Sequence, residues 1–321
     1  MKRSFCISTP QLFWLIFAYV LGGLMLHCGG DFASALFACL FSVCLCVIAS
    51  ALCLGRGSFS ESMERFPAGV ASAVRWVCAF FLGIPISASL ISFSGRAAAY
   101  YESASPYAVL ALLAVICVFT VRNGFSAAAR FAETLALPLA ILLMLSLLGG
   151  RGDGMSLDFA TDELFGGGLV IGSAAVFFSL YLRCTAEGSP NMSRFAKNSA
   201  FHPSPLACGI VGVLSATAVY FWLCFAGASG ILASFFSWFL CVGRLFTLCI
   251  SACDILSLPE AVGISQKTRR VTALLAICFV QAAFYGTYSS VFGAAAMIGN
   301  VLIPCAAWAF SFVMLNKKTP V

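Results

Sequence analysis

The sequence predicts an all-α integral membrane protein with ten transmembrane helices. Of its 321 residues, 61% are hydrophobic and only 9% are charged, and the mean hydropathy is +1.01. So few charged side chains cannot coat the surface of a soluble globule of this length. Ten apolar stretches run through the chain, and its basic residues gather in alternate loops between them. The sequence is therefore typical of a multi-pass membrane protein.

Each predicted helix is an apolar run, because crossing the hydrocarbon core takes roughly 20 such residues. The fourth and sixth runs are shorter than the others. The predicted helices are 11–28, 32–54, 70–93, 107–121, 125–148, 168–182, 206–225, 231–256, 271–288 and 291–315.

The distribution of basic residues predicts the orientation of these helices. With a cytoplasmic N-terminus, fifteen of the eighteen Lys and Arg residues fall on the cytoplasmic side, and two, Arg96 and Arg151, fall outside. The positive-inside rule predicts this bias for short loops, and both chain ends then lie in the cytoplasm. The same bias gives the formal net charge of +6. We therefore expect cytoplasmic loops that face anionic lipid, and no nucleic-acid partner.

We expect a single transmembrane domain over residues 1–321. The longest polar stretches, 149–167 and 183–205, are too short to bury a hydrophobic core of their own. Ten helices divide naturally into two halves of five, at about 8–150 and 165–316.

No Cys-x-x-Cys pair occurs among the sixteen cysteines, so we expect them to act as small hydrophobic side chains. We expect no metal and no cofactor.

Glycines interrupt the first and sixth predicted helices. Gly22 and Gly23 lie inside the first, and Gly172 and Ser173 lie at the corresponding place in the sixth. In transporters with inverted repeats, helices that unwind at such positions offer backbone N–H groups to an anionic ligand. The alternative is that the glycines only let two helices approach closely. We name these four residues as candidate ligand-binding positions.

Charges inside predicted helices are the second indication of a binding site, since each is costly in hydrocarbon unless it finds a partner. Arg244 lies in the middle of the eighth helix and is the fifth candidate ligand-binding residue. Its partner is expected to come from another helix, from backbone carbonyls, or from the carboxylate of a ligand. Glu133 of the fifth helix is the best protein candidate, although Arg130 lies three residues before it and could pair with it locally. Arg130, Glu133 and Asp254 are expected to be structural or coupling charges.

Three stretches resemble the permease-like B subunit of Ger-type spore germinant receptors. Residues 8–13 (STPQLF) resemble the start of that subunit. Residues 122–133 (RNGFSAAARFAE), running on to Pro138, resemble its fifth helix, and Phe66-Pro67 fits its second cytoplasmic loop. After Arg244-Leu245, where the family tends to place an acid, this chain has Phe246 and Thr247.

The resemblance implies the amino acid, polyamine and organocation transporter superfamily, with a LeuT-like 5+5 inverted repeat. It also implies a small nutrient, such as an amino acid, bound between helices one, three, six and eight. The implied partners are a larger receptor A subunit and a C-subunit lipoprotein in the inner membrane of a spore.

We therefore expect a permease-like receptor subunit that binds a nutrient in the membrane and triggers spore germination. A secondary active amino acid transporter of the same fold is the alternative, and a scaffold subunit that binds no ligand is a third hypothesis. An enzyme is least expected, because no Ser/His/Asp, paired-carboxylate or metal-binding pattern is present.

Overall fold

The computed structural model describes residues 9–27, 32–53, 66–100, 105–123, 125–146, 205–226, 239–245 and 247–249. Within these ranges the regular structure is entirely α-helical, with no strand. The predicted all-α class is confirmed for this part of the chain.

Six helices and one shorter helical segment coincide with predicted helices. The six are α1 (Thr9–His27), α2 (Phe32–Cys53), α4 (Ala68–Tyr100), α5 (Pro106–Asn123), α6 (Phe125–Ser146) and α9 (Pro205–Ala226). The shorter segment, Phe239–Cys249, is helical on both sides of position 246 and lies inside the predicted helix 231–256.

The largest difference from the prediction is at the C-terminal end of α4, which continues to Tyr100 instead of stopping at 93. The prediction ended where the apolar run meets Gly95 and Arg96. Three alanines follow, and alanine is the strongest helix former, so the helix continues although the apolar run does not. At 1.5 Å per residue, the 33-residue α4 is about 50 Å long.

Prolines mark the beginnings of several helices. Proline occupies the first position of α5 and α9, the second of α1, and the position immediately before α4. A first-turn residue has no intrahelical acceptor for its N–H, so the missing N–H of proline costs nothing there. At α5, the Ser105 carbonyl oxygen accepts hydrogen bonds from the N–H groups of Ala108 and Val109, at 3.0 and 3.2 Å.

Helix α1 lies at the centre of the described structure. Its side chains from Leu15 to Leu24 are buried all the way around the helix. A helix that is apolar on every face must be surrounded by other elements, and α1 packs against α9, α6 and α4. Helix α2 packs on α9, and α5 packs on α4 and α6.

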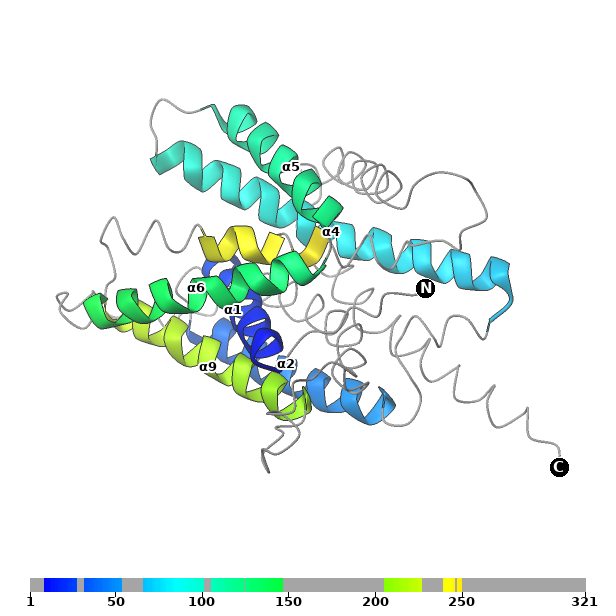
Figure 1. Cartoon of the computed structure of the whole chain (residues 1–321), viewed down its shortest axis with the longest axis horizontal. Coiled ribbons are helices and arrows are strands. Elements are labelled where there is room, and N and C mark those ends of the chain that lie inside the picture. Colours follow the sequence, from blue (N-terminus) through cyan, green and yellow to red (C-terminus); the bar gives the residue numbers. More distant parts are fainter. Residues whose placement is uncertain are drawn as a thin grey trace, which may run out of the picture.

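Neighbouring helices alternate in direction. In Figure 1, α4, α6 and α9 run from right to left, whereas α2 and α5 run from left to right. Helices joined by short connections must reverse in this way, and the alternation agrees with the order of the predicted spans.

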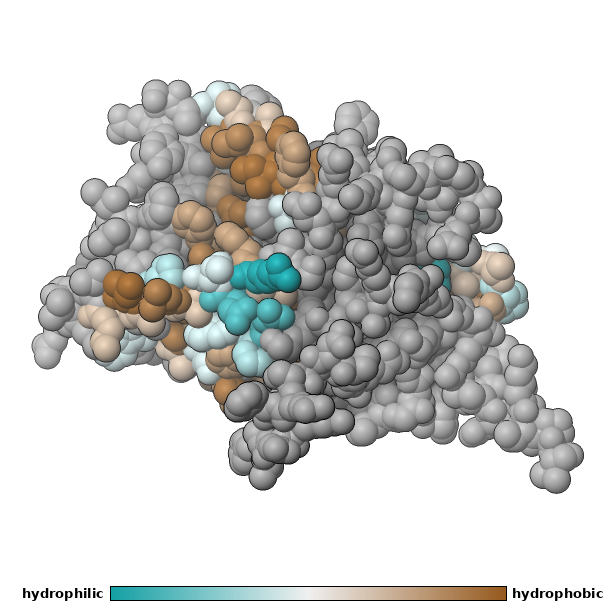
Figure 2. Space-filling model, viewed as in Figure 1, coloured by the Kyte–Doolittle hydropathy of each residue, from teal (hydrophilic) through white to brown (hydrophobic). Residues whose placement is uncertain are grey.

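The outer faces of the helices are apolar. Large hydrophobic side chains are more than half exposed on α2, α5, α6 and α9, among them Leu40, Leu112, Leu137 and Met144. Figure 2 shows this apolar surface, with a small hydrophilic patch beside it. One stretch in the described part, Ala207–Cys224 of α9, is long and apolar enough to cross a membrane, and shorter apolar helical stretches occur in α1, α2, α5 and the Phe239–Cys249 segment.

Candidate functional site

The candidate site is the place where the Phe239–Cys249 segment crosses α1. Arg244 is completely buried there, and its Nη1 donates a hydrogen bond of 3.0 Å to the backbone carbonyl oxygen of Tyr19. The guanidinium carbon of Arg244 also lies 4.5 Å from the centroid of the Tyr19 ring. Tyr19 is itself 1% exposed, so both contacts are shielded from solvent. Tyr19 thus contacts the arginine through both its backbone and its side chain.

These contacts offset part of the cost of burying a charge. Removing a guanidinium from water costs several kcal/mol, which only good geometry recovers. A hydrogen bond from a charged donor is worth about 1.5–3 kcal/mol. A cation over an aromatic ring contributes about 2 kcal/mol when the pair is desolvated. Arg244 is therefore stabilised against α1.

Gly22 allows the backbone of α1 to contact the backbone of the Phe239–Cys249 segment. A Cβ atom at Gly22 would lie 2.6 Å from the carbonyl oxygen of Leu240, closer than real Cβ contacts come. The thiol of Cys241 lies on the same side and contacts the Gly22 carbonyl oxygen at 3.8 Å. The α1 helix is continuous through Gly22 and Gly23, so the predicted unwinding of this helix does not occur here. Close packing, the alternative interpretation of these glycines, is what the geometry supports.

Helix α6 closes the site on another side through Phe131. The ring of Phe131 packs on the ring of Phe239, with centroids 6.4 Å apart. A Cβ at Gly243 would lie 3.5 Å from this ring, an ordinary van der Waals distance. The residue before Arg244 is therefore packed against α6, and two helices, α1 and α6, contact the segment that carries the arginine.

Glu133 has a different partner from the one expected. Its Oε2 accepts a hydrogen bond of 3.0 Å from Nε2 of Gln11, which joins the beginning of α1 to α6. Within the described residues, Glu133 forms no ion pair with Arg244 or with Arg130, and both Arg130 and Glu133 are exposed. The Arg244–Glu133 clamp is therefore absent from the described residues, and Arg244 instead donates to a backbone carbonyl, that of Tyr19.

The Gln11–Glu133 contact supports a prediction of small effect. Glu133→Gln keeps the shape of the side chain and removes its charge, and an exposed hydrogen bond contributes about 0.5–1.5 kcal/mol. We expect the thermal unfolding midpoint of the purified protein to change by no more than a few degrees. A drop well beyond a few degrees would show that Glu133 contributes more to stability than this geometry indicates.

The structure brings together two of the predicted site residues, Gly22 and Arg244, with Gly23 buried beside them in α1. The predictions for Gly172, Ser173 and Asp254 fall outside the described residues. Sequence reasoning missed Tyr19. It lies three residues before Gly22 and therefore on the same face of α1, and this spacing was the signal that could have identified it.

Nothing else in the described part of the chain assembles a site of comparable chemistry. No three His, Cys, Asp or Glu side chains gather there as a metal site would require. The buried hydroxyls of Thr217 and Thr247 each donate to the carbonyl oxygen four residues earlier, at 2.9 Å. Comparison of the chain with protein-family models and with curated proteins finds no match.

Proposed function

We propose that the chain is a multi-pass membrane protein with ten helices in a LeuT-like 5+5 inverted repeat and both ends in the cytoplasm. The alternating directions of the described helices support this proposal, as does their agreement with the predicted spans. Their half-exposed apolar side chains are suited to lipid, and would be unfavourable over so large an area in water.

The positions of contacts along the helices support the same arrangement. Tyr19 and Arg244 lie at the middle of the predicted helices 11–28 and 231–256, so a contact between them belongs at the membrane midplane. Gly212 approaches Ile16, and each lies seven residues beyond the first residue of its helix, α9 or α1. Helices that enter the membrane from the same side are expected to meet at equal depth.

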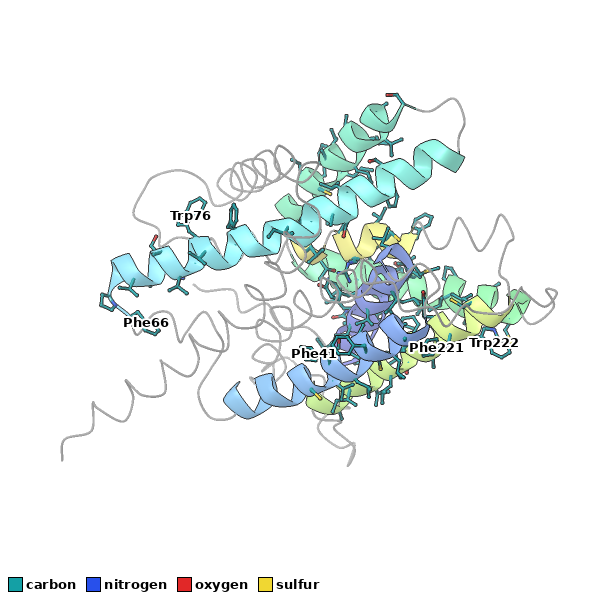
Figure 3. The ribbon with its side chains drawn as sticks, turned by 180° about the vertical axis from the view of Figure 1, so that it is seen from behind. Phe41, Phe66, Trp76, Phe221 and Trp222 are labelled. Atoms are coloured by element: carbon teal, nitrogen blue, oxygen red, sulfur yellow. The ribbon has the colours of Figure 1, made fainter. Side chains whose placement is uncertain are left out.

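Aromatic residues give a further sign of the membrane boundaries. Figure 3 shows Trp76 and Trp222 at opposite ends of the described structure, Trp76 on α4 and Trp222 near the end of α9. The proposed topology places the first toward the cytoplasm and the second toward the outside. Tryptophan is enriched at both membrane interfaces, where its amphipathic ring meets the headgroups.

The proposed function is that of a permease-like subunit of a nutrient germinant receptor. The observation that carries it is the burial of Arg244 against the central helix α1, because an ionised side chain deep in a helical bundle marks a ligand or ion pathway. Arg244 would bind the carboxylate of a small nutrient such as an amino acid. Binding has to differ between two packings of the helices for a signal to pass.

The resemblance of residues 8–13 and 122–133 to Ger-type B subunits supports the receptor role over other non-enzymatic roles. In this proposal the partners are a receptor A subunit, a C-subunit lipoprotein and the surrounding membrane lipid. The chain would bind and signal without catalysing a reaction.

The proposal is tested with the purified full chain reconstituted in liposomes and supplied with a radiolabelled mixture of the common L-amino acids. We expect saturable binding with no accumulation inside the liposomes, whether or not a proton or sodium gradient is applied. Gradient-driven accumulation would identify the alternative, a secondary active transporter. Absence of binding in both conditions would contradict a ligand site.

The proposed topology makes a separate prediction. Alkaline phosphatase fused within the loop 149–167 is expected to be active, because that loop is outside, and a fusion after Val321 is expected to be inactive. Green fluorescent protein at the same two positions should give the opposite pattern. Activity of both phosphatase fusions, or of neither, would contradict ten helices with both ends inside.

A further inference from the structure

The outer face of α6 carries a stripe of exposed side chains at a regular spacing. Its members are four, three, four and three residues apart, which is the spacing along which two helices pack side by side. Two of them, Leu137 and Met144, are 71% and 68% exposed, the highest values among the large hydrophobic residues of the described part. The outer stripe consists of Arg130, Thr134, Leu137, Ile141 and Met144.

The outer stripe changes from charged to apolar along the helix. Arg130 lies at its beginning, and the exposed Glu133 lies one turn further along the same face. In Figure 2 a hydrophilic patch covers the first half of α6, and apolar side chains cover its second half. One helix face therefore combines two opposite charges with an apolar surface.

The depth of these charges is unfavourable for a surface that faces lipid. Arg130 and Glu133 lie five and eight residues after the first residue of α6, or about 8 and 12 Å along its axis. The long side chain of arginine extends back to the headgroups from such a depth, but that of glutamate is too short. Gln11 donates a neutral hydrogen bond to Glu133, which leaves the charge uncompensated. A charge so placed in hydrocarbon needs a partner of opposite sign.

Pro138 gives a second reason to expect protein on this face. It is exposed and lies inside α6, where it has no N–H to donate to the carbonyl oxygen of Thr134, four residues earlier. In hydrocarbon, backbone groups released by a proline are satisfied by neighbouring helices and their side chains. A lipid chain offers no such group.

The face is complementary to itself. Two copies related by a twofold axis along the membrane normal have parallel α6 helices, and each position faces its own counterpart. Arg130 and Glu133 are three residues apart, about 4.5 Å along the axis, which the arginine side chain spans. Each arginine then meets the glutamate of the other copy, and the apolar residues of the stripe pack against each other.

We infer that the outer stripe of α6 is an interface between two copies of this chain, in which Arg130 of each copy pairs with Glu133 of the other. This inference rests on the membrane placement in the proposed function, and it adds a partner that is identical to the chain itself.

The test measures energy transfer between copies of the purified full chain that carry a donor or an acceptor fluorescent protein after Val321, reconstituted together in liposomes. We expect wild-type transfer to persist in excess lipid. Arg130→Glu and Glu133→Arg each place like charges opposite one another, so each variant alone should associate at least about tenfold more weakly. Mixing the two variants, or combining both substitutions in one chain, restores opposite charges and should restore the transfer.

A second pair of variants tests the apolar part of the stripe. Leu137→Ala removes an apolar contact of the inferred interface, and Leu112→Ala on α5 is the matched control, because Leu112 is 62% exposed on a different helix. We expect weaker transfer for Leu137→Ala and wild-type transfer for Leu112→Ala. This pair keeps the test decisive if a charge-reversal variant does not fold.

Wild-type transfer no higher than that of a monomeric membrane protein at the same density would overturn the inference, and this face would then be covered by lipid or by a different subunit. Equal transfer by the wild type, both charge-reversal variants and Leu137→Ala would also overturn it. Failure of the proposed function gives other patterns. A chain that does not float with the liposomes contradicts the membrane placement, whereas a chain that binds no amino acid but keeps charge-dependent transfer contradicts only the receptor role.

Discussion

Spores that carry Arg244→Ala are expected to need at least about tenfold more of an amino-acid mixture than wild-type spores for half-maximal germination. Truncating one member of a desolvated, hydrogen-bonded charge pair costs about 2–5 kcal/mol, and 1.4 kcal/mol already corresponds to a factor of ten. Arg244 would be such a member, because it is fully buried and anchored to Tyr19. The measurement is the dose dependence of dipicolinic acid release.

Arg244→Lys distinguishes charge from shape. Lysine keeps the positive charge but is a compact ammonium that cannot reproduce the planar fork or its stacking on the Tyr19 ring. We expect an intermediate response, between those of the wild type and Arg244→Ala. Dose curves for both variants that match the wild type, at equal protein levels in the membrane fraction, would remove Arg244 from the ligand site.

Among the glycines at 22, 69, 212 and 243, Gly22 is expected to give the largest effect on stability when it is changed to alanine. The added methyl group would meet the Leu240 carbonyl oxygen at 2.6 Å, and backbone cannot move aside as a flexible side chain can. Overpacking of this kind costs about 1–3 kcal/mol. Alanine regains up to about 1 kcal/mol of helix propensity, which is too little to offset the clash.

Three other glycines give a matched series for the same substitution. A Cβ at Gly69 meets no atom within 4 Å, one at Gly243 meets the Phe131 ring at 3.5 Å, and one at Gly212 meets the Ile16 side chain at 3.0 Å. We expect unchanged or raised thermal midpoints for Gly69→Ala and Gly243→Ala. Gly212→Ala should lower the midpoint slightly, and Gly22→Ala by several degrees. A Gly22→Ala protein as stable as Gly69→Ala would refute the close contact at Leu240.

The positions of the described helices could be predicted because each coincides with a long apolar run. The C-terminal end of α4 could not be predicted from the apolar pattern, because the high helix propensity of the alanines at 97–99 extends the helix beyond the apolar run. The continuity of α1 through Gly22 was also not predictable. Glycine permits unwinding and close packing alike, and the position of Leu240, far away in the sequence, selects the second.

The candidate site was predictable only in part. A charge in the middle of a predicted helix had to be buried, and Arg244 is. Its contact with Tyr19 depends on the rotation of two helices about their axes, which the apolar pattern does not define because α1 is hydrophobic on every face. The pairing of Glu133 with Gln11 likewise follows from the packing of α1 against α6 and from no local pattern.

Nutrient-triggered release of dipicolinic acid from spores that lack this gene tests the receptor proposal most directly. A nutrient-independent trigger serves as the control, and amino-acid uptake by vegetative cells is measured in the same strain. The proposal predicts that the spores fail to respond to particular amino acids, germinate normally with the control trigger, and show unchanged uptake. Normal germination together with defective uptake would contradict it and identify the chain as a transporter.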